Sequence, residues 1–175
     1  MLTIALAVVL GLVALVLAFA ATKPSHFRWE RSAQMNAAPA GVLAEITDFH
    51  RWAAWSPWEK IDPAMTRTHS GAPSGVGAVY EWQGNKKVGR GRMEVLEATQ
   101  GKVTIKLDFF EPYEAHNLCE FSAEPKDGGT HVTWAMHGPT PFMSKVMQVF
   151  MNLEKLVGKD FENGLANLKA VVERT

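Results

Sequence analysis

This 175-residue chain has one cysteine and a formal net charge of zero. The single cysteine, Cys119, cannot close an internal disulfide, so burial of apolar side chains must hold the fold together. The 18 lysine and arginine residues balance the 18 aspartate and glutamate residues, which leaves no overall field to attract a polyanion. We therefore expect no nucleic-acid partner, and an apolar content of 47% predicts a folded chain.

Familiar catalytic and metal-binding motifs are also missing. The six histidines show no metal-ligand spacing, and the patterns HExxH, CxxC and GxSxG do not occur. The stretch GVGAVY, residues 75–80, lacks the helix that a dinucleotide-binding fingerprint requires. We therefore expect no metal, no cofactor and no assigned catalytic residue, with His50 and His69 left open as general bases.

The first twenty-two residues carry no charged side chain. Residues 2–21, LTIALAVVLGLVALVLAFAA, contain one hydroxyl, and twenty helical residues at about 1.5 Å each reach roughly 30 Å, the thickness of a bilayer core. The sequence AFA at 18–20 also fits a signal-peptidase site, but no lysine or arginine precedes the run, which exceeds the roughly 7 to 15 residues of a signal core. We predict an uncleaved transmembrane anchor over residues 1–22 and a second domain over residues 23–175.

The anchor predicts a single-pass membrane protein, and the flanking charges bear on its orientation. Lys23, Arg28 and Arg31 all follow the apolar run, and the positive-inside rule then keeps the second domain on the cytoplasmic side. Because Arg28 and Arg31 fall within a predicted strand, the side of the membrane stays open.

Alternating polarity predicts a strand at the start of the second domain. From Phe27 to Met35, apolar side chains fall on one parity and polar ones on the other, apart from Arg31. A short helix is expected next, because Pro39 suits a first helical turn and apolar residues recur at helical spacing up to Phe49.

The stretch SPWE, residues 56–59, predicts a second short helical turn, with Ser56 as its N-cap and Glu59 completing a capping box. Beyond it, strand-like segments are separated by turn residues, which predicts an antiparallel meander. These segments are residues 78–83, 87–98, 103–110, 116–124 and 130–137, with a weaker candidate at MTRTHS, residues 65–70.

After Pro141 the sequence predicts one long amphipathic helix. Apolar residues step by three or four, and charged residues occupy the opposite face. Such a helix must bury its stripe, and the apolar face of the sheet is the available partner, so the fold class is α+β. The stripe consists of Phe150, Leu153, Val157, Phe161, Leu165, Leu168 and Val172.

The order of these elements and several segments resemble a known family. DFHRWAAWSPWEK, GVGAVYEW, GNKKVGRGRMEV and THVTWAMHGPTPF are similar to the bacterial polyketide cyclase/dehydrase and lipid-transport family, within the superfamily of START domains and birch-pollen allergens. The resemblance covers residues 26 to about 173 and implies a helix-grip fold, in which a curved antiparallel sheet wraps around the long C-terminal helix and leaves an elongated apolar cavity. It also implies a small hydrophobic ligand and, for an anchored chain, the bacterial inner membrane.

Candidate binding residues follow from this plan and from strand parity. Trp52, Trp55 and Trp58 are spaced by three and would form the cavity floor or rim, or serve only as core. Methionines at steps of four in residues 143–151 would form a gate, or pack as core. Asn117, the polar member of the inward parity, would orient a polar group of the ligand or satisfy a neighbouring backbone group. The predicted ligand-binding residues are Trp52, Trp55, Tyr80, Trp82, Met93, Asn117, Trp134, Met136, Met147 and Met151.

The sequence thus predicts a membrane-anchored protein that binds a small hydrophobic molecule, such as a lipid or polyketide-like compound, without covalent chemistry. Glycines at 89, 91, 158 and 164 fit this interpretation by leaving room for a ligand, and they fit close packing of helix on sheet equally well. An enzyme of the cyclase/dehydrase type and a module that engages a protein partner are the alternatives.

Overall fold

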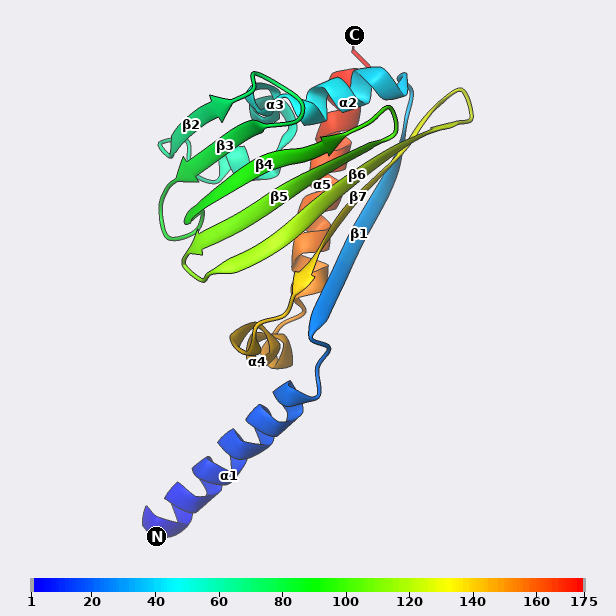
Figure 1. The fold of residues 1–175 in the computed structure, drawn as a ribbon. Coiled ribbons are helices and arrows are strands. Elements are labelled where there is room, and N and C mark those ends of the chain that lie inside the picture. The colour runs from blue at the N-terminus through cyan, green and yellow to red at the C-terminus, as the bar shows by residue number, and fades with distance from the viewer. Residues whose placement is uncertain (1, 175) are drawn as a thin grey trace.

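Seven strands and a long C-terminal helix form the body of the protein in the computed structural model, which describes residues 2–174 (Figure 1). Its elements are α1 (Leu2–Ala21), β1 (His26–Met35), α2 (Pro39–Thr47), the 3₁₀ helix η1 (Phe49–Arg51), α3 (Trp52–Trp55), the 3₁₀ helix η2 (Pro57–Lys60), β2 (Thr66–Gly71), β3 (Ala78–Gln83), β4 (Arg90–Ala98), β5 (Lys102–Glu111), β6 (Ala115–Lys126), β7 (Gly129–Pro139), α4 (Phe142–Phe150) and α5 (Leu153–Val172).

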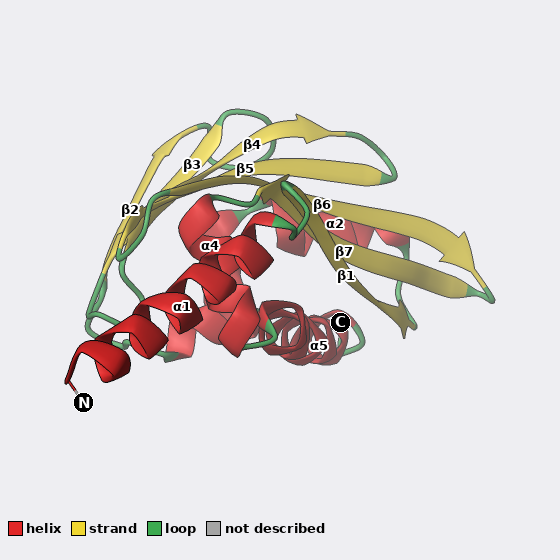
Figure 2. Cartoon of the chain, turned by 90° about the horizontal axis from the view of Figure 1, so that it is seen from below, coloured by secondary structure: helices red, strands yellow, loops and turns green. Residues whose placement is uncertain are grey.

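The strands form one antiparallel sheet in the order β1-β7-β6-β5-β4-β3-β2. Irregular pairing between β4 and β5, near Gly91 and Val95, adds bulges that bend the sheet. The sheet curves around α5, which lies on its concave side (Figures 1 and 2). One predicted boundary was wrong: β4 begins at Arg90 rather than at residue 87, because Gly89 adopts a φ of 68° in the preceding turn. The predicted α+β helix-grip fold is confirmed.

The core lies between the concave face of the sheet and α5. Alternate strand residues point inward, as in β5, where Val103, Ile105 and Leu107 are all buried. The stripe of α5 packs against this face, and Phe161 stacks on Trp134 of β7 with ring centroids 4.5 Å apart. Burial of this stripe is what holds the helix against the sheet.

The glycines of α5 allow side chains of the sheet to approach the helix closely. A Cβ at Gly164 would lie 2.7 Å from the Trp134 ring, and one at Gly158 would overlap the guanidinium of Arg31. Arg31, the polar exception on the inward parity of β1, donates from Nε to Glu162 Oε1 at 2.8 Å. In α5, the glycines therefore serve close packing of helix and sheet.

The prediction of a single helix after Pro141 was wrong. The chain forms α4 and α5, separated by Met151 and Asn152 in extended conformation. The Asn152 side chain caps α5 by accepting a hydrogen bond from Lys155 N at 2.9 Å. The first backbone N–H groups of a helix have no acceptor within the helix, and the Asn152 side chain supplies one. A new helix can therefore start here. Phe150, predicted as the first member of the buried stripe, is 73% exposed.

The predicted capping box was also wrong. Ser56 occupies the N-cap position of η2, but its side chain makes no capping hydrogen bond. The Glu59 carboxylate instead bonds with Tyr80 of β3 and Arg67 of β2. A long-range pairing between η2 and the sheet thus replaces the local cap.

Helix α1 projects away from the body at the end where α4 lies (Figure 1). Within α1, Ala20 is buried and Val16 half-buried, and the other residues are exposed. Among residues 2–174, α1 is the one helix long and apolar enough to cross a membrane, as judged by length and composition. A hydrogen bond from Thr140 N to Ser25 O, at 2.7 Å, joins the segment after α1 to the end of β7.

Candidate ligand-binding site

A mostly apolar cavity of about 210 Å³ lies between the sheet, α5 and the short helical segments. An engineered apolar cavity of about 150 Å³ holds benzene, so this volume suits a somewhat larger organic molecule. Apolar and aromatic walls with a few polar groups are typical of small-molecule sites. The lining residues are Trp52, Ser56, Trp58, Glu59, Met65, Tyr80, Trp82, Lys87, Val88, Met93, Leu107, Phe109, Cys119, Trp134, Met136, Val157 and Phe161.

The structure brings six of the predicted binding residues together in this wall: Trp52, Tyr80, Trp82, Met93, Trp134 and Met136. The other four do not line it. Trp55 is fully buried, and its indole Nε1 donates to Glu45 O at 3.3 Å. Asn117 is buried with its amide oxygen against Gly138 of β7. Met147 is half-buried in α4, and Met151 is 49% exposed in the segment after it.

Several lining residues were not among the predicted site residues. Leu107, Phe109 and Cys119 carried a usable signal, because they share the inward parity of their strands. Val157 and Phe161 belong to the apolar stripe of α5. Strand parity and the apolar stripe of a helix show which face of the element a residue occupies. They do not show how far along the element the cavity lies.

Two wall residues, Glu59 and Tyr80, belong to a polar cluster that Arg67 completes. The Tyr80 hydroxyl donates to Glu59 Oε1 at 2.5 Å, and Arg67 Nε donates to Glu59 Oε2 at 2.7 Å. Arg67 Nη2 also donates to the Glu59 carbonyl oxygen at 3.1 Å. Burial and the neighbouring Glu59 carboxylate raise the pKa of Tyr80 well above its usual range. Because phenol and carboxylate satisfy each other, neither is free to abstract a proton from a bound molecule.

Trp134, a residue of the wall, has a buried indole N–H without a hydrogen-bond partner among the described residues. Trp134 is 2% exposed, and its Nε1 has no hydrogen-bond acceptor within the described part of the chain. Burial raises the pKa of the adjacent Cys119 thiol to about 12, against a smaller opposing effect of the indole. The thiol is therefore neutral and a weak acceptor at best. A buried donor without an acceptor costs roughly 1–3 kcal/mol, which an acceptor on a ligand would recover.

Gly91 sets the position of one cavity wall, because a Cβ there would overlap the Trp82 indole and lie 2.6 Å from Asp108 O. We expect Gly91→Ala to displace Trp82 and to lower the free energy of unfolding by about 1–3 kcal/mol. Denaturant titration of the detergent-solubilised chain measures this. Gly101→Ala is the control, since its Cβ would meet Ala123 O at an ordinary 3.8 Å. Equal stability of the two variants would contradict the assigned packing.

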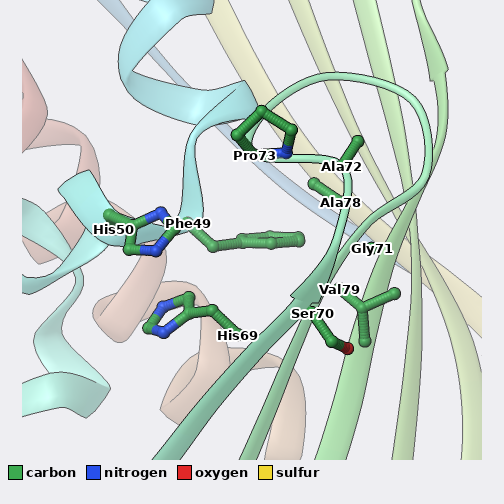
Figure 3. A pocket seen from close by; sticks show the side chains of 9 residues that line it. All are labelled: Phe49, His50, His69, Ser70, Gly71, Ala72, Pro73, Ala78 and Val79. Carbon is green, nitrogen blue, oxygen red and sulfur yellow. The ribbon is translucent and has the colours of Figure 1, made fainter.

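The two histidines left open as general bases lie at a second, shallower hollow of about 120 Å³. Figure 3 shows the imidazoles of His50 and His69 face to face at its edge, and their ring centroids are 4.1 Å apart. His50 Nδ1 lies 3.0 Å from Asp48 Oδ1, while burial and then His50 lower the pKa of His69. Neither histidine lines the apolar cavity, so neither is placed to act on a ligand there. Residues 2–174 contain no group of three or more histidine, cysteine or acidic side chains arranged to hold a metal ion.

A curved antiparallel sheet gripping a C-terminal helix, with an apolar cavity between them, defines the helix-grip class of domains. Residues 26–173 match the model of the family described as polyketide cyclase/dehydrase and lipid transport, and the chain belongs to this family. No curated protein shows significant sequence similarity to the chain.

Solved structures share the fold at low sequence identity. A Mesorhizobium loti protein is 15% identical, with a TM-score of 0.61 over 85% of this chain and 98% of its own. The di-domain ARO/CYC StfQ of the steffimycin biosynthetic pathway is 10% identical, with a TM-score of 0.62 over 85% of this chain and 51% of its own. Ara h 8.0201 is 12% identical, with a TM-score of 0.55 over 86% of this chain and 99% of its own. At these identities the likeness concerns the fold alone.

Proposed function

We propose that the chain is a membrane-anchored binding protein for a small apolar molecule that carries one hydrogen-bond acceptor. The apolar cavity, together with the buried indole N–H of its wall residue Trp134, which has no partner among the described residues, is the observation that carries this proposal. Burial of apolar ligand surface supplies the affinity, and an acceptor on the ligand pairs with Trp134 Nε1–H. Six of the predicted residues, among them Trp52 and Met136, contribute to the walls.

The polar cluster favours binding over catalysis. Glu59, the carboxylate of the wall, is held by Arg67 and Tyr80, and a general base must be able to reach a proton of its substrate. The cluster therefore acts as a structural brace in this proposal, and the bound molecule leaves unchanged.

The anchor suits such a ligand, because apolar molecules partition into bilayers. Exposed apolar residues cover α1, and its 20 residues reach roughly 30 Å. Lys23 lies two residues after the end of the helix, which favours the cytoplasmic side for the domain. In this arrangement the cavity collects its ligand beside the membrane that holds it.

Matched probes test the proposed ligand chemistry. Equal amounts of 2-acetylnaphthalene and 2-ethylnaphthalene, offered together to the detergent-solubilised chain, differ only in the acceptor. We expect native mass spectrometry to show the ketone bound in preference by roughly five- to tenfold, the contribution of one hydrogen bond. Trp134→Phe should remove the preference, whatever it does to overall affinity.

Trp52→Phe is the matched control for this measurement. Trp52 also lines the cavity, but its Nε1 already donates to Ile46 O at 2.9 Å. This variant should keep the preference for the ketone. Failure of both probes to bind would refute the proposed carrier function, while binding without a preference would refute the role of Trp134.

A further inference from the structure

Helix α4 exposes apolar rather than polar side chains. Phe142, Met143 and Phe150 are 51%, 59% and 73% exposed, whereas its polar residues, Lys145 among them, are half-buried. Met151, directly after α4, is 49% exposed as well. Large apolar side chains gathered on one short helix favour a non-aqueous environment.

Helix α4 packs against the carboxyl end of α1. Val16 and Ala20, one helical turn apart, are the shielded residues of α1, which places the contact on its last turns. At about 1.5 Å per residue, Val16 lies only about 8 Å from the end of the apolar helix. Amphipathic helices at a bilayer surface insert to a depth of about 5–10 Å, so the position of α4 along α1 matches that depth.

The same end of the domain leads to the ligand cavity. Figure 1 shows α4 at the end of the body nearest α1, below the sheet and α5. Helix α5 begins three residues after the end of α4, and Val157, in its second turn, lines the cavity. If α4 contacts lipid, the next element along the chain, α5, forms part of the cavity wall.

We propose that α4 is an interfacial membrane helix, which inserts Phe142, Met143 and Phe150 into the acyl boundary beside the point where α1 leaves the bilayer. This inference rests on the proposed membrane anchor. Its occupant is lipid, because the exposed apolar side chains belong to a helix that packs against α1, whose own exposed apolar side chains face lipid in the proposed anchor. The two helices together fix the tilt of the domain, with the cavity end held toward the bilayer.

Spin labels at three single cysteines measure this arrangement in the full chain, reconstituted in vesicles of phosphatidylcholine and phosphatidylglycerol. The positions are Leu10 in α1, Met143 in α4 and Ala40 in α2, all exposed. Native Cys119 is 4% exposed, so the unsubstituted protein serves as the unlabelled blank. Accessibility to oxygen against a water-soluble nickel chelate reports the depth of each label.

We expect the label at 10 deep in the bilayer, the label at 143 about 5–10 Å below the phosphates, and the label at 40 in water. A label at 143 as accessible to nickel as the one at 40, while the label at 10 is deep, would overturn the role of α4 and leave the anchor intact. A label at 10 that is accessible to nickel would overturn the anchor, and with it the inference on α4.

Discussion

Replacement of Val157 by tryptophan should lower ligand affinity roughly 50- to 100-fold, with little effect on the fold. Val157 lines the cavity from α5 and is half-buried, so the larger side chain can occupy space that a ligand would fill. Loss of roughly 100 Å² of buried ligand surface at about 25 cal/mol per Å² corresponds to about 2.5 kcal/mol, which gives this factor. Because the indole enters an existing cavity, the free energy of unfolding should change by less than about 1.5 kcal/mol.

Leu156→Trp is the matched control. Leu156 is the preceding residue of α5 and is 63% exposed, so the same side chain is added outside the cavity. Titration of either naphthalene probe, followed by native mass spectrometry, should show wild-type affinity for this variant. If the variant at 157 binds as tightly as the variant at 156, ligand does not occupy this cavity.

The fold was predictable because parity and helical periodicity persist along whole elements. Val103, Ile105 and Leu107 repeat every second residue, and each repeat adds to the same assignment of the inward face. These repeating patterns do not predict the hydrogen bonds that single polar side chains form. Asn152 starts a second helix through one hydrogen bond, and Glu59 leaves its expected cap for partners in the sheet.

The site was less predictable than the fold, because the cavity occupies only part of the inner face. Asn117 and Met136 both lie on the inward parity of their strands, yet only Met136 reaches the cavity. The tryptophan series shows the same limit, since Trp52 and Trp58 line the cavity while Trp55 packs in the core. Of the methionines predicted to form a gate, Met147 lies on α4 and Met151 directly after it, and neither lines the cavity.

The Glu59–Arg67 pair should be the most stabilising polar contact at the cavity. The Glu59 side chain is 8% exposed and that of Arg67 is 28% exposed. Arg67→Met would leave the carboxylate buried with Tyr80 as its remaining side-chain partner, and removal of one partner of a buried pair costs several kcal/mol. We expect a loss of about 2–3 kcal/mol in the free energy of unfolding at neutral pH, near the lower end of that range because Arg67 is partly solvated.

Two comparisons separate this loss from the loss of an ordinary surface contact. Arg92→Met removes an arginine with the same 28% exposure from its pair with Glu94, whose side chain is 33% exposed, and should cost less than about 1 kcal/mol. Glu59→Gln combined with Arg67→Met should recover much of the stability, because no buried charge is left without its partner. Denaturant titrations at neutral pH measure the stability of all three variants. A deficit for Arg67→Met no larger than that for Arg92→Met would show that solvent, rather than the arginine, compensates the carboxylate at the cavity wall.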